Sequence, residues 1–150
     1  KLKKIQFMKK LFSIFLLSAI ACIFSLNSNA QSIKEHKVVI QLNTADTASW
    51  SSTIGNIKNL QKVWPNNISI EVVVHGKGLD LLVANKTHLA NDVNGLTKEG
   101  VVFSACENSM RKHNITKADL LPVAMTVPSG VAELVLKQEQ GWSYLKATVN

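Results

Sequence analysis

The chain has 150 residues, of which 46% are hydrophobic and 18% are charged, and its formal net charge is +7. This length allows one domain with a substantial core and is too short for two. Five of the seventeen basic residues are lysines within the first ten positions, so residues 31–150 carry twelve basic and ten acidic residues. This near-balanced charge argues against a nucleic-acid partner, because phosphate binding requires clustered Lys and Arg.

Residues 1–30 have the three-part pattern of a secretory signal peptide. Basic residues are followed by an apolar run from Leu11 to Leu26 and then by a short polar stretch that ends at Ala30. Ser28 and Ala30 are the small residues expected before a cleavage site, and Met8 is the expected natural start. The apolar run is shorter than the roughly 20 residues of a typical membrane span. A retained N-terminal anchor is the alternative.

Cleavage before Gln31 predicts a mature chain of residues 31–150, folded as one periplasmic or secreted domain that does not contact the membrane. Cys22 follows a weak lipoprotein-like stretch, but the apolar run continues beyond it, so lipid attachment there is the less expected outcome. Cys106 then remains as the only cysteine, and an internal disulfide is impossible.

The mature sequence alternates between strand and helix patterns. The predicted strands are 37–42, 68–75, 101–105, 123–127 and 144–149. The apolar spacing from Ala48 to Trp64 predicts a helix capped by Asp46 or Thr47. Residues 79–84 predict a short helical turn.

Helices are also predicted around Leu89, Val93 and Leu96 and over 106–113. Thr116 and Asp119 form a capping box for a further short turn. A last helix follows Gly130 and ends at Gly141, and we expect its Val131, Leu134 and Val135 to point inward.

Strands that alternate with helices require crossover connections, which favour a parallel sheet covered by helices on both faces. We therefore predict an α/β fold, specifically a three-layer α/β/α sandwich with a mostly parallel five-stranded sheet of the flavodoxin-like kind.

Functional sites in such sheets form beyond the carboxyl ends of the strands. The strand ends predicted here carry Asn43, the run from His75 to Gly78, Cys106 with Asn108, and Ser129 with Gly130. A thiol at the start of a helix is acidified by the helix dipole and by unpaired N–H groups, and a neighbouring His75 could move a proton. The alternative is that Cys106 is a small buried apolar residue and that His75 only closes a strand.

Other common chemistries lack their motifs in this sequence. There is no dinucleotide or P-loop pattern, so neither cofactor is expected. The four histidines lack metal-ligand spacing, and we expect no metal site. Ser129 lacks the flanking glycines of a nucleophile elbow and is expected to cap a helix.

Three segments resemble the DsrE/DsrF-like family, in particular its small exported bacterial members. They are 73–78 (VVHGKG), 100–110 (GVVFSACENSM) and 127–133 (VPSGVAE). The resemblance spans about residues 37–146 and implies a three-layer α/β/α fold and a homo-oligomer, a trimer or a hexamer. It also implies that Cys106 corresponds to the cysteine of the family's F-x-A-C-x-N-[ST]-M segment. In the sulfur-relay members a strand-end cysteine carries persulfide sulfur between partner proteins.

The first hypothesis is therefore a sulfur-handling protein that acts as a sulfur carrier between a donor and an acceptor protein rather than as an ordinary turnover enzyme. Cys106 and His75 would be its reactive residues. The pocket residues would be Asn43, Gly76, Gly78, Asn108, Ser129 and Gly130. The alternatives are a non-catalytic oligomer that binds a small ligand or a partner, and a redox-sensing thiol that links two subunits.

Overall fold

Strands and helices alternate along residues 35–148, the part of the chain that this computed structural model describes. The elements are β1 (His36–Leu42), α2 (Thr47–Val63), β2 (Ile68–Val74), η1 (Gly76–Leu81), α3 (Ala90–Lys98), β3 (Val102–Cys106), α4 (Glu107–Lys112), η2 (Lys117–Asp119), β4 (Met125–Val127), α5 (Gly130–Glu139) and β5 (Ser143–Lys146). The predicted signal peptide and Cys22 lie outside the described residues. Within those residues, no helix is long and apolar enough to cross a membrane.

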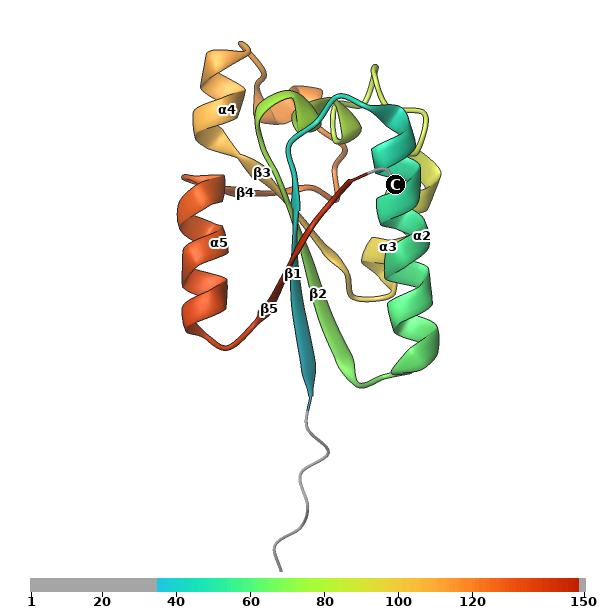
Figure 1. The fold of residues 1–150 in the computed structure, drawn as a ribbon. Coiled ribbons are helices and arrows are strands. Elements are labelled where there is room, and N and C mark those ends of the chain that lie inside the picture. The colour runs from blue at the N-terminus through green and yellow to red at the C-terminus, as the bar shows by residue number, and fades with distance from the viewer. Residues whose placement is uncertain (1–34, 149–150) are drawn as a thin grey trace, which may run out of the picture. The chain divides into compact units, whose positions relative to one another are not determined.

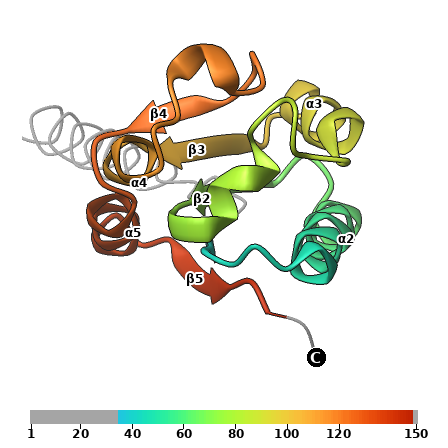
Figure 2. The same ribbon diagram turned by 90° about the horizontal axis from the view of Figure 1, so that it is seen from above.

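The five strands form one sheet in the order β4-β3-β2-β1-β5, and every pairing is parallel. Leu42 pairs with Val74, and Val74 pairs with Ala105. The register therefore brings the carboxyl ends of the central strands to one edge, where Cys106 pairs with Val127 of β4. Figure 2 shows β4, β3, β2 and β5 in this order from above, with helices on both sides.

Helices α2 and α3 cover one face of the sheet, and α5 covers the other, with α4 above it (Figure 1). The prediction of a three-layer α/β/α fold is confirmed, and the sheet is entirely parallel. The larger core lies on the α2 and α3 side, where Phe103 is fully buried among the inward-facing residues of β1, β2 and β3. This arrangement leaves the carboxyl edge open for a site.

Helix α2 begins as the sequence predicts. Asp46 is its N-cap and accepts hydrogen bonds from the N–H groups of Ala48 and Ser49. Trp50 is buried and donates its indole N–H to the carbonyl oxygen of Thr44 at 2.8 Å. The helix is thus fixed directly after the turn that follows β1.

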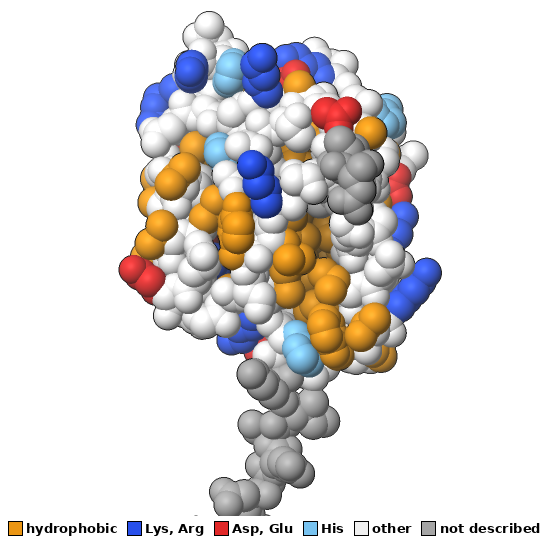
Figure 3. Space-filling model, in the orientation of Figure 1, with side chains coloured by type: hydrophobic (Ala, Val, Ile, Leu, Met, Phe, Trp, Pro, Cys, Tyr) orange, Lys and Arg blue, Asp and Glu red, His pale blue; other side chains and the backbone are white. Residues whose placement is uncertain are grey.

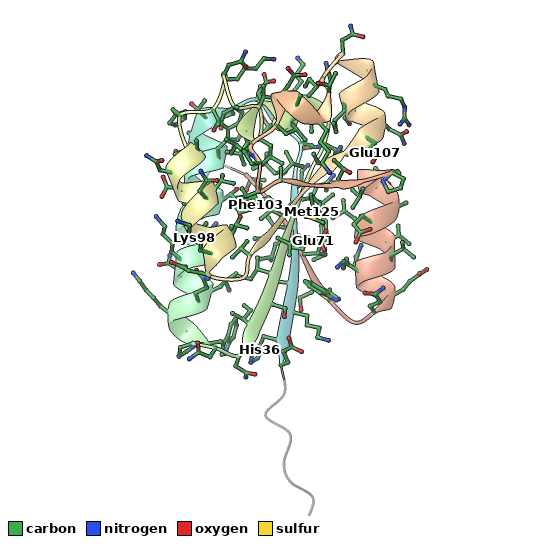
Figure 4. The ribbon with its side chains drawn as sticks, turned by 180° about the vertical axis from the view of Figure 1, so that it is seen from behind. His36, Glu71, Lys98, Phe103, Glu107 and Met125 are labelled. Atoms are coloured by element: carbon green, nitrogen blue, oxygen red, sulfur yellow. The ribbon has the colours of Figure 1, made fainter. Side chains whose placement is uncertain are left out.

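The α5 side of the sheet has a smaller apolar core and a buried ion pair. Val39, Val73 and Leu134 form the apolar cluster. Glu71 is 3% exposed and accepts hydrogen bonds from Ser104 at 2.6 Å and from Lys137 at 2.5 Å. Figure 4 shows Glu71 on the sheet, toward α5. The pair ties α5 to the middle of the sheet.

The prediction that Val131 and Val135 point inward is wrong, since they are 60% and 48% exposed. Gly130, Leu134 and Lys137 lie at i, i+4 and i+7 and form the face against the sheet, so each valine is turned about 100° away from it. The apolar pattern of α5 did not predict this orientation, because the inner face of the helix carries the polar Lys137.

The last two predicted strands are shorter in the structure. Strand β4 begins at Met125, because Ala124 is in a turn and donates its N–H to the carbonyl oxygen of Leu121 at 2.9 Å. Strand β5 ends at Lys146. Trp142 follows the end of α5 and packs against the smaller core.

Candidate functional site at the carboxyl edge of the sheet

Cys106 occupies the junction that the sequence predicts. It is the last residue of β3 and the N-cap of α4, and it is a free cysteine with 4% of its surface exposed. Strand β3 is central enough to be covered on both faces, so the thiol is held close to the protein interior rather than in solvent.

Hydrogen-bond donors from two helices surround the Cys106 sulfur. They are the Ser109 hydroxyl and the backbone N–H groups of Gly130, Ser109 and Asn108. Burial alone raises the pKa of the Cys106 thiol, but these donors outweigh burial, and the pKa lies below its ordinary value. The site therefore stabilises a thiolate, which is the nucleophilic form of cysteine.

Ser109 is held in the orientation of a donor. The N–H of Gly76 donates to the Ser109 hydroxyl oxygen at 2.9 Å, which leaves the hydroxyl proton for the sulfur of Cys106. Gly76 has a φ of +55°, a conformation that glycine adopts without strain. The turn after β2 thus supports the thiol through Ser109.

Gly130 brings the start of α5 into contact with the strand ends. A Cβ atom at this position would lie 3.1 Å from Cβ of Cys106 and 3.2 Å from Cβ of His75. A side chain there would press on both neighbours, which would have to shift by a few tenths of an ångström. This close approach is what places the Gly130 N–H against the sulfur.

His75 lies beside Cys106 but is bonded elsewhere. Its Nε2 atom is 2.8 Å from Nε2 of Gln41, and the Tyr144 hydroxyl donates to the other end of the Gln41 amide. Burial lowers the pKa of the His75 imidazole below its ordinary value. Among residues 35–148, no hydrogen bond joins His75 to Cys106, so the two share a site without forming an ion pair.

The other predicted pocket residues divide into two groups. Asn108 contributes its backbone N–H to the sulfur, while its side chain accepts a hydrogen bond from Arg111. Ser129 caps α5 as predicted and accepts from the N–H of Ala132 at 3.4 Å.

Two of the predicted residues lie farther from the sulfur. Asn43 is exposed, and its carbonyl oxygen lies 3.7 Å from where a Cβ of Gly76 would be. Gly78 is buried against Leu42, whose carbonyl oxygen would lie 2.6 Å from an added Cβ. Gly78 therefore allows the turn to pack closely on β1.

A cavity of about 310 Å³ lies next to this edge. Its lining includes Gly76 and the basic side chains of Lys77, Lys86 and His113. Lys86 is paired with Asp80 at 2.8 Å. The cavity meets the thiol site at Gly76, which bonds to Ser109, but Cys106 itself is not in its wall.

Sequence reasoning missed Ser109, Gln41 and Tyr144. Ser109 stands three positions after the N-cap Cys106. A side chain at this position can reach back to the N-cap residue, so the capping pattern could have predicted its contact with Cys106. Gln41 is a polar residue that interrupts the apolar run of Val38, Val39, Ile40 and Leu42, a pattern that often marks a buried hydrogen bond. For Tyr144 no local signal exists, because its partner comes from the neighbouring strand.

Within the described residues, no cluster of three or more His, Cys, Asp or Glu side chains could hold a metal ion. The molecule is thus an α/β protein with a parallel sheet and an acidified thiol at its carboxyl edge. Residues 36–147 match the DsrE/DsrF-like family, and the chain belongs to this family.

Two solved structures have the same fold. A protein of unknown function from Methanobacterium thermoautotrophicum, MTH1491, is 32% identical with a TM-score of 0.72, and the match covers 75% of this chain and 99% of that chain. A conserved protein of unknown function from Bacteroides thetaiotaomicron, BT1422, is 20% identical with a TM-score of 0.60, and the match covers 79% and 99% of the two chains. No curated protein matches the sequence.

Proposed function

We propose that this protein handles sulfur through Cys106, as a carrier that holds one sulfur atom as a persulfide. The observation that carries the proposal is the convergence of four hydrogen-bond donors on one nearly buried sulfur atom. These donors favour thiolate, which is the species that attacks sulfane sulfur. Membership of the DsrE/DsrF-like family supports the same reading.

The chemistry needs no bound cofactor. With thiosulfate as donor, the Cys106 thiolate forms a bond to the outer sulfur, and the S–S bond of thiosulfate breaks. Sulfite leaves with the bonding electron pair, and the negative charge of the thiolate ends on the terminal sulfur of the persulfide. We propose that His75 also takes part in this reaction, because its polar side chain lies beside the sulfur.

The test is incubation of the purified mature protein, residues 31–150, with thiosulfate or polysulfide, followed by intact mass. We expect the wild-type chain to gain the mass of one sulfur atom, and reducing agent should remove it. The Cys106→Ser variant should gain nothing. Absence of added sulfur on the wild type, or equal addition to Cys106→Ser, would overturn the proposal.

The cavity of about 310 Å³ beside Gly76 favours a second candidate, a module that binds a small ligand without a covalent step. A ligand-binding module would keep its affinity in Cys106→Ser, whereas a sulfur carrier would lose its cargo. The two candidates are separated by titrating Cys106→Ser with small anions and following the N–H signals of Gly76 and Lys77 by NMR. Shifts of these signals would support the ligand-binding module.

We also propose that the chain forms a homo-oligomer, as the family resemblance implies. Val131, Val135 and Leu136 on α5 are exposed, as is Met125 on β4. Figure 3 shows apolar side chains gathered over α5 on the left of the molecule. Light scattering should give the mass of a trimer or a hexamer, and a monomer at micromolar concentration would contradict this.

We also propose that the protein is exported from the cytoplasm. The basic and apolar pattern of residues 1–30 supports secretion into the periplasm or beyond, with transfer of sulfur to or from a partner protein there. Cell fractionation of the full chain, with N-terminal sequencing, should find a mature form that starts at Gln31. A full-length protein in the cytoplasm would contradict it.

A further inference from the structure

Three strands contribute side chains to a hydrogen-bond chain at the open edge of the sheet. Gln41 comes from β1, His75 follows β2, and Tyr144 comes from β5. Gln41 pairs with Val73, and Tyr144 pairs with Val39, both of which face α5. Since side chains alternate along a strand, all three project on the α5 side, the same side as Cys106.

The donor and acceptor roles in this chain follow from its chemistry. The nitrogen of the Gln41 amide lies 2.8 Å from Nε2 of His75, and an amide nitrogen can only donate. With the amide in this orientation, Nε2 of His75 accepts and carries no proton. The Gln41 oxygen accepts from the Tyr144 hydroxyl in this same orientation of the amide.

A neutral imidazole whose Nε2 accepts carries its single proton on Nδ1. A second proton on Nε2 would face the Gln41 amide group, and two donors would then oppose each other. The charge on His75 is disfavoured in addition by its partial burial. His75 thus has no free acceptor nitrogen for the proton of Cys106.

We propose that Gln41 and Tyr144 are positioning residues that hold His75 as a neutral hydrogen-bond donor, through its Nδ1–H, rather than as the base of the thiol. The role of this donor rests on the proposed sulfur reaction, in which it would bind the departing anion or the persulfide. The thiolate itself is maintained by the fixed donors of α4 and α5.

Few charged groups on the α5 side of the sheet could change the protonation of His75. Lys146 stands opposite Gln41 in β5 and is exposed to solvent, where its charge is screened. Cys106 on β3 is the neighbouring titratable group. Glu71 and Lys137 lie deeper under α5 and are paired with each other.

The first test is the protonation state of His75 in the wild-type protein, read from the ¹⁵N shifts of its ring by NMR near neutral pH. We expect the proton on Nδ1 and a bare Nε2. This measurement needs neither a variant nor a sulfur donor, so its result does not depend on whether Cys106 forms a persulfide. A proton on Nε2, or a charged ring, would overturn the proposal.

The second test is Gln41→Glu, which replaces the amide donor with a carboxylate of the same shape. A carboxylate accepts from Nε2–H, so we expect the pKa of His75 to rise from below its ordinary value to above it. Gln140→Glu makes the same charge change at the exposed end of α5 and is the matched control. Tyr144→Phe should leave the ring partly in the other tautomer. An equal His75 pKa in Gln41→Glu and Gln140→Glu would overturn the assignment.

Discussion

The start of helix α5 touches the end of strand β3 so closely that a Cβ on Gly130 would lie 3.1 Å from Cβ of Cys106. We predict that Gly130→Ala pushes α5 away from the sheet, weakens the N–H donation to the sulfur and raises the pKa of the thiol. Overpacking of this kind costs about 1–3 kcal/mol of stability. Denaturant unfolding and the pH dependence of thiol alkylation measure the two effects.

Gly55→Ala is the matched control for that substitution. Gly55 lies within α2, where an added Cβ would meet nothing within 4 Å. The control should gain about 0.5–1 kcal/mol, because alanine favours helix, and its thiol should titrate as in the wild type. Equal thiol titration in Gly130→Ala and Gly55→Ala would contradict the role of the Gly130 N–H.

Ser109→Ala removes the only side-chain hydroxyl among the donors to Cys106. We expect the pKa of the thiol to rise and alkylation at neutral pH to slow. The N–H of Gly76 also loses its acceptor, which costs about 1 kcal/mol. Ser129→Ala serves as a control, because Ser129 caps α5 without donating to the sulfur. An unchanged alkylation rate in Ser109→Ala would refute the assignment.

Lys137→Met should destabilise the protein by about 3 kcal/mol, because it leaves the Glu71 carboxylate buried without its cation. The double variant Glu71→Gln/Lys137→Met should recover much of this loss. Lys58→Met breaks an exposed ion pair with Asp92 at 2.7 Å and should cost less than about 1 kcal/mol. Equal losses in Lys137→Met and Lys58→Met would show that the buried pair contributes no more than a surface one.

Stability should depend on the protonation of His75. Burial lowers the pKa of His75 in the folded state, so the unfolded chain takes up a proton more readily. The stability that neutral His75 contributes is complete above the ordinary histidine pKa of about 6.5, which applies to the unfolded chain. It is lost as the pH falls through the lower pKa of the folded state. Urea unfolding from pH 7.5 to pH 5 should show this fall in the wild type and a shallower one in His75→Gln. An equal fall in His75→Gln would contradict this linkage.

Much of the fold is predictable because the apolar runs of β1 and β2 and the caps at Asp46 and Ser129 are local signals. Parallel strands then bring their carboxyl ends together, which is why His75, Cys106 and Gly130 could be grouped without coordinates. The facing of α5 could not be predicted. Its inner side carries Lys137, whose partner Glu71 lies in a distant strand, so an apolar count alone placed Leu134 correctly but also turned Val131 and Val135 inward.

The environment of the sulfur is less predictable than its location. The helix that follows Cys106 implies that local N–H groups point at it, but the contribution of Gly130 depends on the packing of α5. The partner of His75 is likewise set by strand order, since Gln41 and Tyr144 become neighbours only when β5 joins the edge of β1.

The donors that acidify Cys106 come from segments far apart in the chain, and Gly76 supports one of them from a third segment. In an unfolded chain Cys106 has lost these donors and is an ordinary, solvent-exposed thiol. Its lowered pKa arises only when α5 and the turn after β2 have reached their final places, while folding also buries the sulfur. The pH dependence of Cys106 labelling during refolding would therefore time the arrival of α5 on the sheet.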